Sequence, residues 1–329
     1  MALPLATLRG LQQSNGDAAW ATALEYAVSV CGASIDSSNA EGIVRQRDDS
    51  LGQLDLFLAT AGWDLWSTFA GSVPRTSDAL IKWWASHQGG RAILLLDGLS
   101  LRELPWILDR ARKEGFQIHS TQATAAELPG DTITFAKAIG FAQRSALANN
   151  GGGGVNFSGA RTESDDLPWT DAAAQIKAEP YWFYWHHWPD TLVHRFADLG
   201  EGLPQLTRET SEQLASASFW HFVERLATGR RLIITSDHGY AVSGGFPDVR
   251  NEEHNRYLKE VFRGKRYVQG KVENSGALPA VAMELDTRNG PYTFALGRRK
   301  WKVAGGFPLL SHGGLSFLEV VVPFIELSR

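Results

Sequence analysis

The stretch "AILLLDG" (92–98) decides the fold that this sequence predicts. Its five leading apolar residues show no alternation with polar ones, so we expect a strand buried on both faces, as in a parallel sheet. A helical stretch follows at 101–115, and then "FQIHST" (116–121) is typical of a second strand. Further strands are expected in "YWFYWHHW" (181–188) and "RLIITS" (231–236). This alternation predicts an α/β fold with a doubly wound, mostly parallel sheet flanked by helices.

The two ends of the chain depart from this alternation. "DAAWATALEYAVSVCG" (17–32) has apolar residues at helical spacing and ends at a glycine. We therefore expect residues 1–75 to form a small, mainly helical accessory region that faces protein partners. Residues 76–329 are expected to form the α/β domain. Near the C-terminus, an Asn-Gly pair between two strand-like runs predicts a hairpin, and "SFLEVVVPFIEL" (316–327) a final strand.

Composition and charge exclude several classes of protein. The 329 residues carry a net charge of -4, so no global basic field favours nucleic acid or an acidic membrane. The one cysteine, Cys31, can form neither an internal disulfide nor a thiolate metal site. Pro4 and Arg9 interrupt the N-terminal residues, which lack the apolar core of a signal peptide, and no apolar run is long enough to span a bilayer. We expect a soluble, cytoplasmic protein without membrane partners.

Two motifs place an Asp and a His beside predicted strand ends. In "WPDTLVHRF" (188–196), Asp190 and His194 are four residues apart, so on a helix they share one face and can hold one cation. An exposed hydrogen bond between them is the plainer alternative. In "SDHG" (236–239), Asp237 and His238 follow an apolar strand directly, which favours a site over a simple surface turn.

Two further residues complete a set of possible metal ligands. Asp97 follows the first buried strand, and His312 precedes two glycines and a buried strand; taken alone, His312 is typical of a core histidine. Parallel strands present their carboxyl ends at one edge of a sheet, so the aspartates are expected to share one crevice. Oxygen and imidazole ligands without thiolate suit zinc or manganese in a hydrolytic site. Six ligands divide well between two metal ions.

The order of these motifs resembles that of the alkaline phosphatase superfamily. The chain has "LLLDG", a threonine downstream, "PDTLVH", "TSDHG" and then a late "HGG". The tail "HGGLSFLEVVVP" is similar more narrowly to the PglZ domain, which occurs in phage-defence systems such as BREX and in some bacterial signalling proteins. The resemblance covers roughly residues 90–329, about three quarters of the chain. It implies an alkaline phosphatase-like fold and two divalent metal ions, Zn²⁺ or Mn²⁺.

The resemblance also implies a role for each ligand. The first metal would be held by a nucleophilic hydroxyl together with Asp97, Asp237 and His238. The second metal would be held by Asp190, His194 and His312.

The nucleophile implied by the resemblance is a Ser or Thr at the start of a helix. "AELPGDTITFAKAIGF" (126–141) fits, and Pro129 stands three positions before Thr132, as in PglZ-like sequences. Thr132 is therefore the expected nucleophile, with Thr134 as the alternative. Thr132 or Asp131 could instead be a simple helix N-cap, in which case a metal-bound hydroxide would attack directly. The sulfatase branch is excluded, because Cys31 lies before Asp97 and lacks the Pro and Arg of the sulfatase motif.

These features together predict a two-metal-dependent phosphoryl-ester hydrolase, a phosphodiesterase or phosphatase of PglZ type that acts in phage defence or nucleotide signalling. Basic residues in 262–271 and 297–302 favour a diester of nucleotide type, although a solvated hairpin is the plainer explanation of 297–302. His186, His187 and the aromatics around them could stack on a base, but strand core and the wall of the crevice are the plainer alternative. The alternatives are a non-catalytic PglZ-type interaction module and a phosphomutase of the same superfamily.

Overall fold

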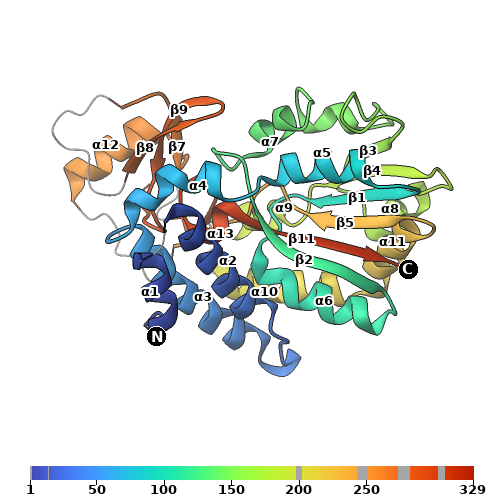
Figure 1. Ribbon diagram of the computed structural model, residues 1–329, viewed down its shortest axis with the longest axis horizontal. Helices are drawn as coiled ribbons and strands as arrows, with labels where there is room; N and C mark the ends of the chain where they lie inside the picture. The colour runs from blue at the N-terminus through green and yellow to red at the C-terminus, as the bar shows by residue number, and fades with distance from the viewer. Residues whose placement is uncertain (1, 14, 198–201, 244–250, 273–281, 303–307) are drawn as a thin grey trace.

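A six-stranded mixed sheet forms the centre of the molecule (Figure 1). The computed structural model describes residues 2–13, 15–197, 202–243, 251–272, 282–302 and 308–329. The strands lie in the order β2 (Gln117–Ala125), β11 (Val321–Ser328), β5 (Arg231–Thr235), β1 (Arg91–Leu96), β4 (Tyr181–His186) and β3 (Arg161–Asp165). β1 pairs in parallel with β4 and β5, and β3 with β4, whereas β11 is antiparallel to both β5 and β2. Five strands therefore run in one direction and β11 runs against them.

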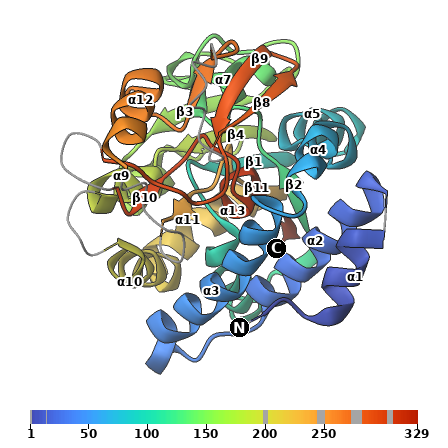
Figure 2. The same cartoon turned by 90° about the vertical axis from the view of Figure 1, so that its left-hand side faces the viewer.

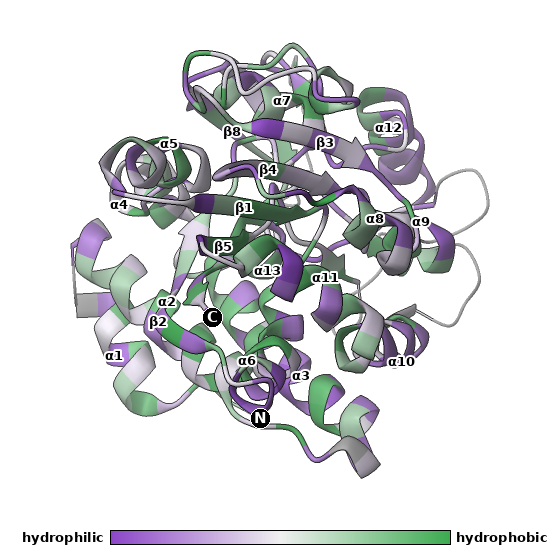
Figure 3. Ribbon diagram, turned by 90° about the vertical axis from the view of Figure 1, so that its right-hand side faces the viewer, coloured by the Kyte–Doolittle hydropathy of each residue, from purple (hydrophilic) through white to green (hydrophobic). Residues whose placement is uncertain are grey.

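Strand β1 is apolar throughout because both faces of the sheet are covered. Leu94 and Leu96 contribute to the core on one face, and Ile93 and Leu95 to the core on the other. In Figure 3, β1 is coloured hydrophobic along most of its length. Helices of the first face are α6 (Leu104–Lys113), α8 (Trp169–Gln175) and α11 (Ala217–Ala227), and those of the second are α5 (Thr76–Ser86) and α7 (Thr132–Ala138). The doubly wound, mostly parallel α/β fold predicted from the sequence is confirmed.

The N-terminal part of the chain is helical and packs against the sheet domain. It contains α1 (Leu5–Gln13), α2 (Gly16–Gly32), α3 (Ala40–Leu58) and α4 (Trp66–Ser72). The buried indole of Trp20, on α2, stacks on Phe317 with ring centroids 6.4 Å apart. Since the apolar side chains of these helices belong to the same core as those of β1, the helices are part of the wall of the sheet domain.

Buried ion pairs join α3 to two distant segments. Asp48 Oδ1 lies 2.6 Å from Arg102 Nη2, and Asp48 Oδ2 lies 2.7 Å from Arg298 Nη1. Arg298 also pairs with Asp55. Burial raises the pKa of Asp48, but the charges of Arg298 and Arg102 outweigh it and hold the pKa below its ordinary value. Arg298 comes from the basic stretch 297–302 and is 1% exposed, so its role is structural and it does not contact a phosphate.

The C-terminal third adds a smaller sheet beside the main one (Figure 2). β7 (Tyr267–Gln269), β9 (Gly290–Ala295) and β8 (Ala282–Thr287) are antiparallel, and the β8–β9 turn lies at the predicted Asn-Gly pair. The expected final strand begins later than predicted, because residues 317–320 form a helical turn that is capped by Ser316 and Glu319. The other elements described are α9 (Asp190–Ala197), α10 (Gly202–Ala215), β6 (Ala241–Val242), α12 (Glu252–Phe262), β10 (Leu310–Ser311) and α13 (Phe317–Val320). None of the helices described combines the length and the apolarity that crossing a membrane requires.

The buried pairs of α3 give a prediction about stability. Asp48→Ala leaves two buried guanidinium groups without their shared carboxylate, so we expect the free energy of unfolding to fall by about 3–5 kcal/mol. Arg110→Ala removes a partly exposed pair with Glu114 and should cost less than about 1 kcal/mol. Urea unfolding followed by circular dichroism measures both. If Asp48→Ala lowered the free energy of unfolding no more than Arg110→Ala does, the buried pairs would not stabilise the fold more than an exposed pair.

Candidate active site

Three aspartates meet at the carboxyl ends of neighbouring strands. Asp97 follows β1, Asp237 follows β5, and Asp190 opens α9 just after β4. The Asp97 N–H donates to the carbonyl of His186, at the end of β4, over 3.0 Å, and the Asp190 N–H donates to the Asp97 carbonyl over 2.8 Å. These backbone bonds fix the loops relative to one another. The expected convergence of the three aspartates is present.

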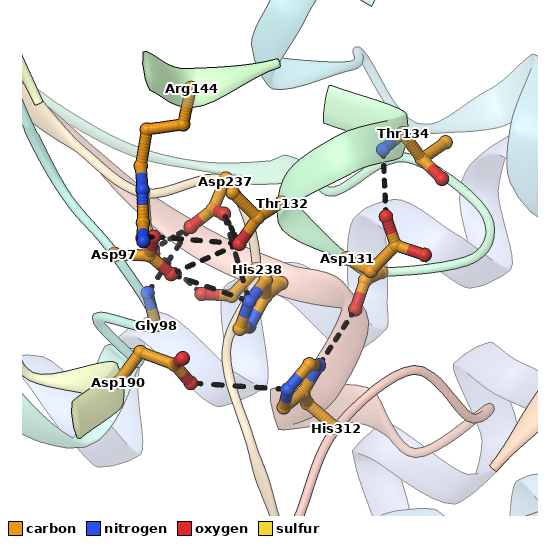
Figure 4. A network of polar contacts seen from close by, with 12 residues as sticks. Asp97, Gly98, Asp131, Thr132, Thr134, Arg144, Asp190, Asp237, His238 and His312 are labelled. Carbon is orange, nitrogen blue, oxygen red and sulfur yellow. Dashed lines mark hydrogen bonds and ion pairs between the residues drawn. The ribbon is translucent and has the colours of Figure 1, made fainter. Parts of the chain in front are cut away.

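The first cluster surrounds the hydroxyl of Thr132 (Figure 4). Thr132 Oγ1 donates to Asp237 Oδ2 over 3.1 Å and lies 3.4 Å from each Asp97 carboxylate oxygen. His238 Nε2 lies 3.5 Å from Asp97 Oδ1 and 3.6 Å from Asp237 Oδ2. Asp97, Asp237 and His238 are fully buried. One hydroxyl, two carboxylates and one imidazole therefore face a common point.

The two candidate threonines have different surroundings. Thr132 is the first residue of α7, and its hydroxyl faces the carboxylates. Thr134 is buried, and its backbone N–H donates over 2.7 Å to Asp131, the N-cap of the helix. In Figure 4, Thr134 lies on the far side of Asp131 from Asp97 and Asp237. The capping reading thus applies to Asp131, and the geometry places Thr132, not Thr134, beside the possible ligands.

The second cluster joins Asp190, His194 and His312. Asp190 Oδ2 lies 3.2 Å from His194 Nε2, one helical turn later, and Asp190 Oδ1 lies 3.9 Å from His312 Nε2. The two imidazole Nε2 atoms are 3.4 Å apart. The other ring nitrogen of His312, Nδ1, lies 3.1 Å from the Gly130 carbonyl oxygen, and this contact fixes the orientation of the ring. One possible ligand atom from each residue lies within 4.8 Å of the others, which is close enough to hold one metal ion.

The two clusters touch through Asp190 and the histidines. Asp190 also groups with Asp97 and His238 within 4.8 Å. The rings of His238 and His312 stack with centroids 4.1 Å apart and nearly parallel planes. The resemblance assigns Asp97, Asp237 and His238 to one metal and Asp190, His194 and His312 to the other. The structure brings all six side chains together at one place, with Asp190 between the two clusters.

Two glycines make this closeness sterically possible. Gly98 has φ +75°, and a Cβ there would lie 3.0 Å from the Cβ of Asp190. A Cβ at Gly239 would lie 2.2 Å from the carbonyl oxygen of Leu318. The Asp-Gly and Asp-His-Gly patterns therefore have a packing reason: a side chain at Gly98 would clash with Asp190, and one at Gly239 would clash with the Leu318 carbonyl.

The crowding of charge shifts the ionisation of these groups. Burial, followed by the neighbouring charges of Asp237 and Asp190, raises the pKa of Asp97 well above its ordinary value. Burial alone would lower the pKa of His238, but Asp237, Asp190 and Asp97 raise it to about 9. Burial and the nearby His238 lower the pKa of His312 to about 4. The site holds more negative charge than its own histidines neutralise.

Two buried polar atoms in the site point to an external cation. Asp190 Oδ1 and His238 Nε2 are inaccessible to solvent and form no hydrogen bond with any described residue. A buried unpaired polar atom is costly unless a ligand satisfies it. The donors are carboxylate, imidazole and hydroxyl, which suits zinc or manganese. The residues present therefore fit divalent metal ions.

Two further residues of the site were missed in the sequence. Arg144 forms an ion pair with Asp97 Oδ2, and the indole N–H of Trp185, on β4, donates to the same oxygen over 3.2 Å. Arg144 begins a short 3-10 helix (Arg144–Leu147) after α7 and belongs to no motif, so only folding brings it to Asp97. Trp185 was included among the aromatics expected either to stack on a base or to form strand core; it is fully buried.

The two histidines that follow Trp185 lie outside the clusters. His186 Nε2 lies 2.9 Å from the Leu167 carbonyl oxygen, and His187 Nε2 lies 3.2 Å from Ser164 Oγ. Both are held by polar groups of the protein away from the ligand set. Of the alternatives that the sequence leaves open for them, a place in the wall beside the sheet fits these contacts.

Comparison with known proteins gives likenesses of structure alone. No protein-family model and no curated protein matches the sequence. Among solved structures, the chain is similar to murine ectonucleotide pyrophosphatase/phosphodiesterase 5, with 12% identity over 73% of this chain and 88% of that one and a TM-score of 0.45. An inactive variant of that protein in complex with AMP gives a TM-score of 0.46 over the same shares, with 12% identity. The human protein gives 0.42 with 12% identity over 72% and 87%. These values do not establish a family for the chain.

The geometry predicts metal binding that depends on Asp190. After dialysis against zinc and removal of excess, we expect about two equivalents per chain in the unaltered protein and at most one in Asp190→Ala, because Asp190 lies in both ligand groups. Elemental analysis by mass spectrometry measures the content. Asp286→Ala, which removes an exposed carboxylate of β8, is the control and should keep both ions. Unchanged zinc content in Asp190→Ala would contradict the assignment.

Proposed function

We propose that this chain is a two-metal-dependent phosphoryl-ester hydrolase of the alkaline phosphatase superfamily, of the PglZ type. The observation that carries the proposal is the position of the Thr132 hydroxyl, 3.1 Å from Asp237 and 3.4 Å from Asp97, next to a second cluster of metal-ligand type. A hydroxyl held among buried carboxylates and imidazoles has the surroundings of a metal-activated nucleophile. The order of the motifs along the chain supports the superfamily, and "HGGLSFLEVVVP" supports the PglZ type.

The proposed roles follow from the contacts of each side chain. Asp237 accepts the hydrogen bond of the Thr132 hydroxyl and so fixes the direction of its lone pairs. Thr132 Oγ1 would attack phosphorus as the bond to the leaving oxygen breaks, and water would later cleave the phosphothreonine. Bound at Asp97, Asp237 and His238 and at Asp190, His194 and His312, divalent cations would supply the positive charge that stabilises the alkoxide and the phosphoryl oxygens.

Arg144 is proposed to contact the phosphoryl group. Its guanidinium reaches Asp97 beside Thr132, and 28% of its side chain is exposed. A planar guanidinium offers several N–H donors in a geometry that matches phosphate oxygens. Trp185, which donates to Asp97 from the buried side, is a positioning residue that keeps this carboxylate oriented.

The cleft beside Thr132 supports a diester of nucleotide type. A cavity of about 510 Å³ lies there, and Ile133, Tyr267 and Trp301 are among its lining residues. Lys265 and Lys300 also line it. A cavity of this size has room for a group on either side of the scissile phosphate, and its aromatic and cationic lining suits a nucleoside ester. The cellular role proposed is phage defence or nucleotide signalling in the cytoplasm, with protein partners at residues 1–75.

Hydrolysis of model esters tests the function. Protein stripped of metal and reloaded with zinc or manganese should cleave bis-p-nitrophenyl phosphate faster than p-nitrophenyl phosphate, and Asp237→Ala should abolish the activity. Thr132→Ala should lower kcat by about 10³-fold or more, because no side-chain nucleophile remains. Thr134→Val keeps the backbone N–H that Asp131 caps and should stay near the wild-type rate.

Two outcomes would overturn the proposal or change it. No turnover together with no bound metal would leave a non-catalytic PglZ-type module as the better account. Conversion of a phosphorylated substrate without release of inorganic phosphate or alcohol would indicate a phosphomutase.

Substitution of Arg144 tests its proposed contact with phosphate. Arg144→Ala should lower kcat/KM for bis-p-nitrophenyl phosphate about 10²–10³-fold, because a charged donor to the developing phosphoryl charge is lost. Arg144→Lys should restore part of the activity, since the charge returns without the planar fork. Arg161→Ala, which removes a half-exposed pair with Glu179 on β3, is the control and should be near wild type. Full activity in Arg144→Ala would exclude the contact.

A further inference from the structure

A second cavity continues from the one beside Thr132. It measures about 730 Å³ and shares four lining residues with the first cavity: Asp131, Ile133, Lys265 and Tyr267. One wall is α7, which begins at Thr132, and the opposite wall is formed by the end of α12 and by β7. In Figure 2, α12 and the small sheet lie on the same side of the molecule as α7. A ligand that reacts at Thr132 can therefore extend past Lys265 into this second space.

Cations dominate the lining of the second cavity. Lys137, Arg263 and Lys271 line it, and Lys265 stands at the junction. The carboxylates that face the same space are Glu260 and Asp131, and Asp131 already accepts hydrogen bonds from Tyr267 Oη and from the Thr134 N–H. The protein as a whole carries a net charge of -4, so this concentration of positive charge is local.

Aromatic and apolar groups lie between these cations. Tyr267 and Tyr292 line the second cavity with ring centroids 6.0 Å apart, and Lys265 Nζ lies 5.0 Å from the centroid of Tyr267. Ile133, next to Thr132, is 58% exposed and borders both cavities. Cations that follow a phosphate backbone, interleaved with rings on which bases stack, are the general chemistry of single-stranded nucleic acid binding.

We propose that the second cavity binds phosphates of the substrate beyond the one that reacts at Thr132. The inference rests on the proposed function and narrows it: the substrate carries a row of phosphates, as an oligonucleotide strand or a nucleoside polyphosphate does. Lys137, Arg263 and Lys271 would contact the distal phosphates, and Lys265 the phosphate next to the scissile one. A simple monoester would leave this cationic space unused.

Binding measured apart from hydrolysis tests the inference. The full chain with Thr132→Ala and zinc present is titrated into a fluorescently labelled 12-nucleotide oligothymidylate, and the dissociation constant is read from fluorescence anisotropy. Adding Lys137→Ala, Arg263→Ala and Lys271→Ala should weaken binding at least about tenfold at low salt. The slope of log K against log salt should fall by about 2, because three phosphate contacts are lost from a single strand. Binding of p-nitrophenyl thymidine 5′-monophosphate, which has one phosphate, should weaken less.

A matched control removes the same charge elsewhere. Arg112→Ala, Lys113→Ala and Lys177→Ala delete one exposed arginine and two exposed lysines on α6 and just after α8, and should leave both the dissociation constant and the salt slope unchanged. ATP as competitor identifies the source of the phosphates. If the cavity substitutions weaken binding of the oligonucleotide alone, the ligand is a nucleic acid strand. If they weaken binding of ATP equally, the ligand is a nucleoside polyphosphate.

The result that overturns the inference is distinct from failure of the proposed function. Equal weakening by the cavity variant and the control variant, or none by either, would show that the second cavity does not bind phosphate. Hydrolysis of bis-p-nitrophenyl phosphate by the unaltered protein is measured separately and decides the proposed function by itself.

Discussion

The candidate active site depends on how the negative charge of its buried carboxylates is compensated. Asp97 and Asp237 are fully buried within 3.6 Å of one imidazole, and Asp190 adds a third negative charge beside them. Charges in such surroundings require compensation, because desolvation is costly and the low dielectric strengthens their repulsion. Arg144 and His238 supply part of it. Asp190 Oδ1 and His238 Nε2, which form no hydrogen bond with any described residue, are the atoms at which divalent cations would supply the rest.

In a second group of buried carboxylates, the negative charge is compensated by arginines of the protein itself. Asp48 and Asp55 on α3 are paired within the protein, by Arg102 and Arg298. Arg102 also donates to the Tyr240 carbonyl over 2.8 Å, two residues after His238. The compensated network therefore supports, through the backbone, the segment that carries Asp237 and His238. Rigid support of this kind holds possible ligands close together although they repel one another.

The small C-terminal sheet gives the site its second wall. Tyr267, on β7, donates to Asp131, which caps the helix that begins at Thr132. Arg266, beside it, pairs with Glu319, and Glu319 caps the turn that follows the glycines after His312. The start of β7 and the residue before it thus contact Asp131, next to Thr132, and Glu319, which follows His312 in the chain. Tyr267 lines both cavities as a result of this placement.

The sequence by itself determined the sheet and the types of side chain that gather at its carboxyl edge, because both follow from local patterns. Continuous apolar runs require strands covered on both faces, and an Asp or Asp-His directly after such a run must lie at the carboxyl edge. Tertiary structure alone decided the rest: the position of the Thr132 hydroxyl beside the carboxylates, the approach of Arg144 to Asp97, the burial of Arg298, and the place of Asp190 between the two clusters. These depend on the direction of a helix end and on contacts between segments far apart in the chain, which no local periodicity encodes.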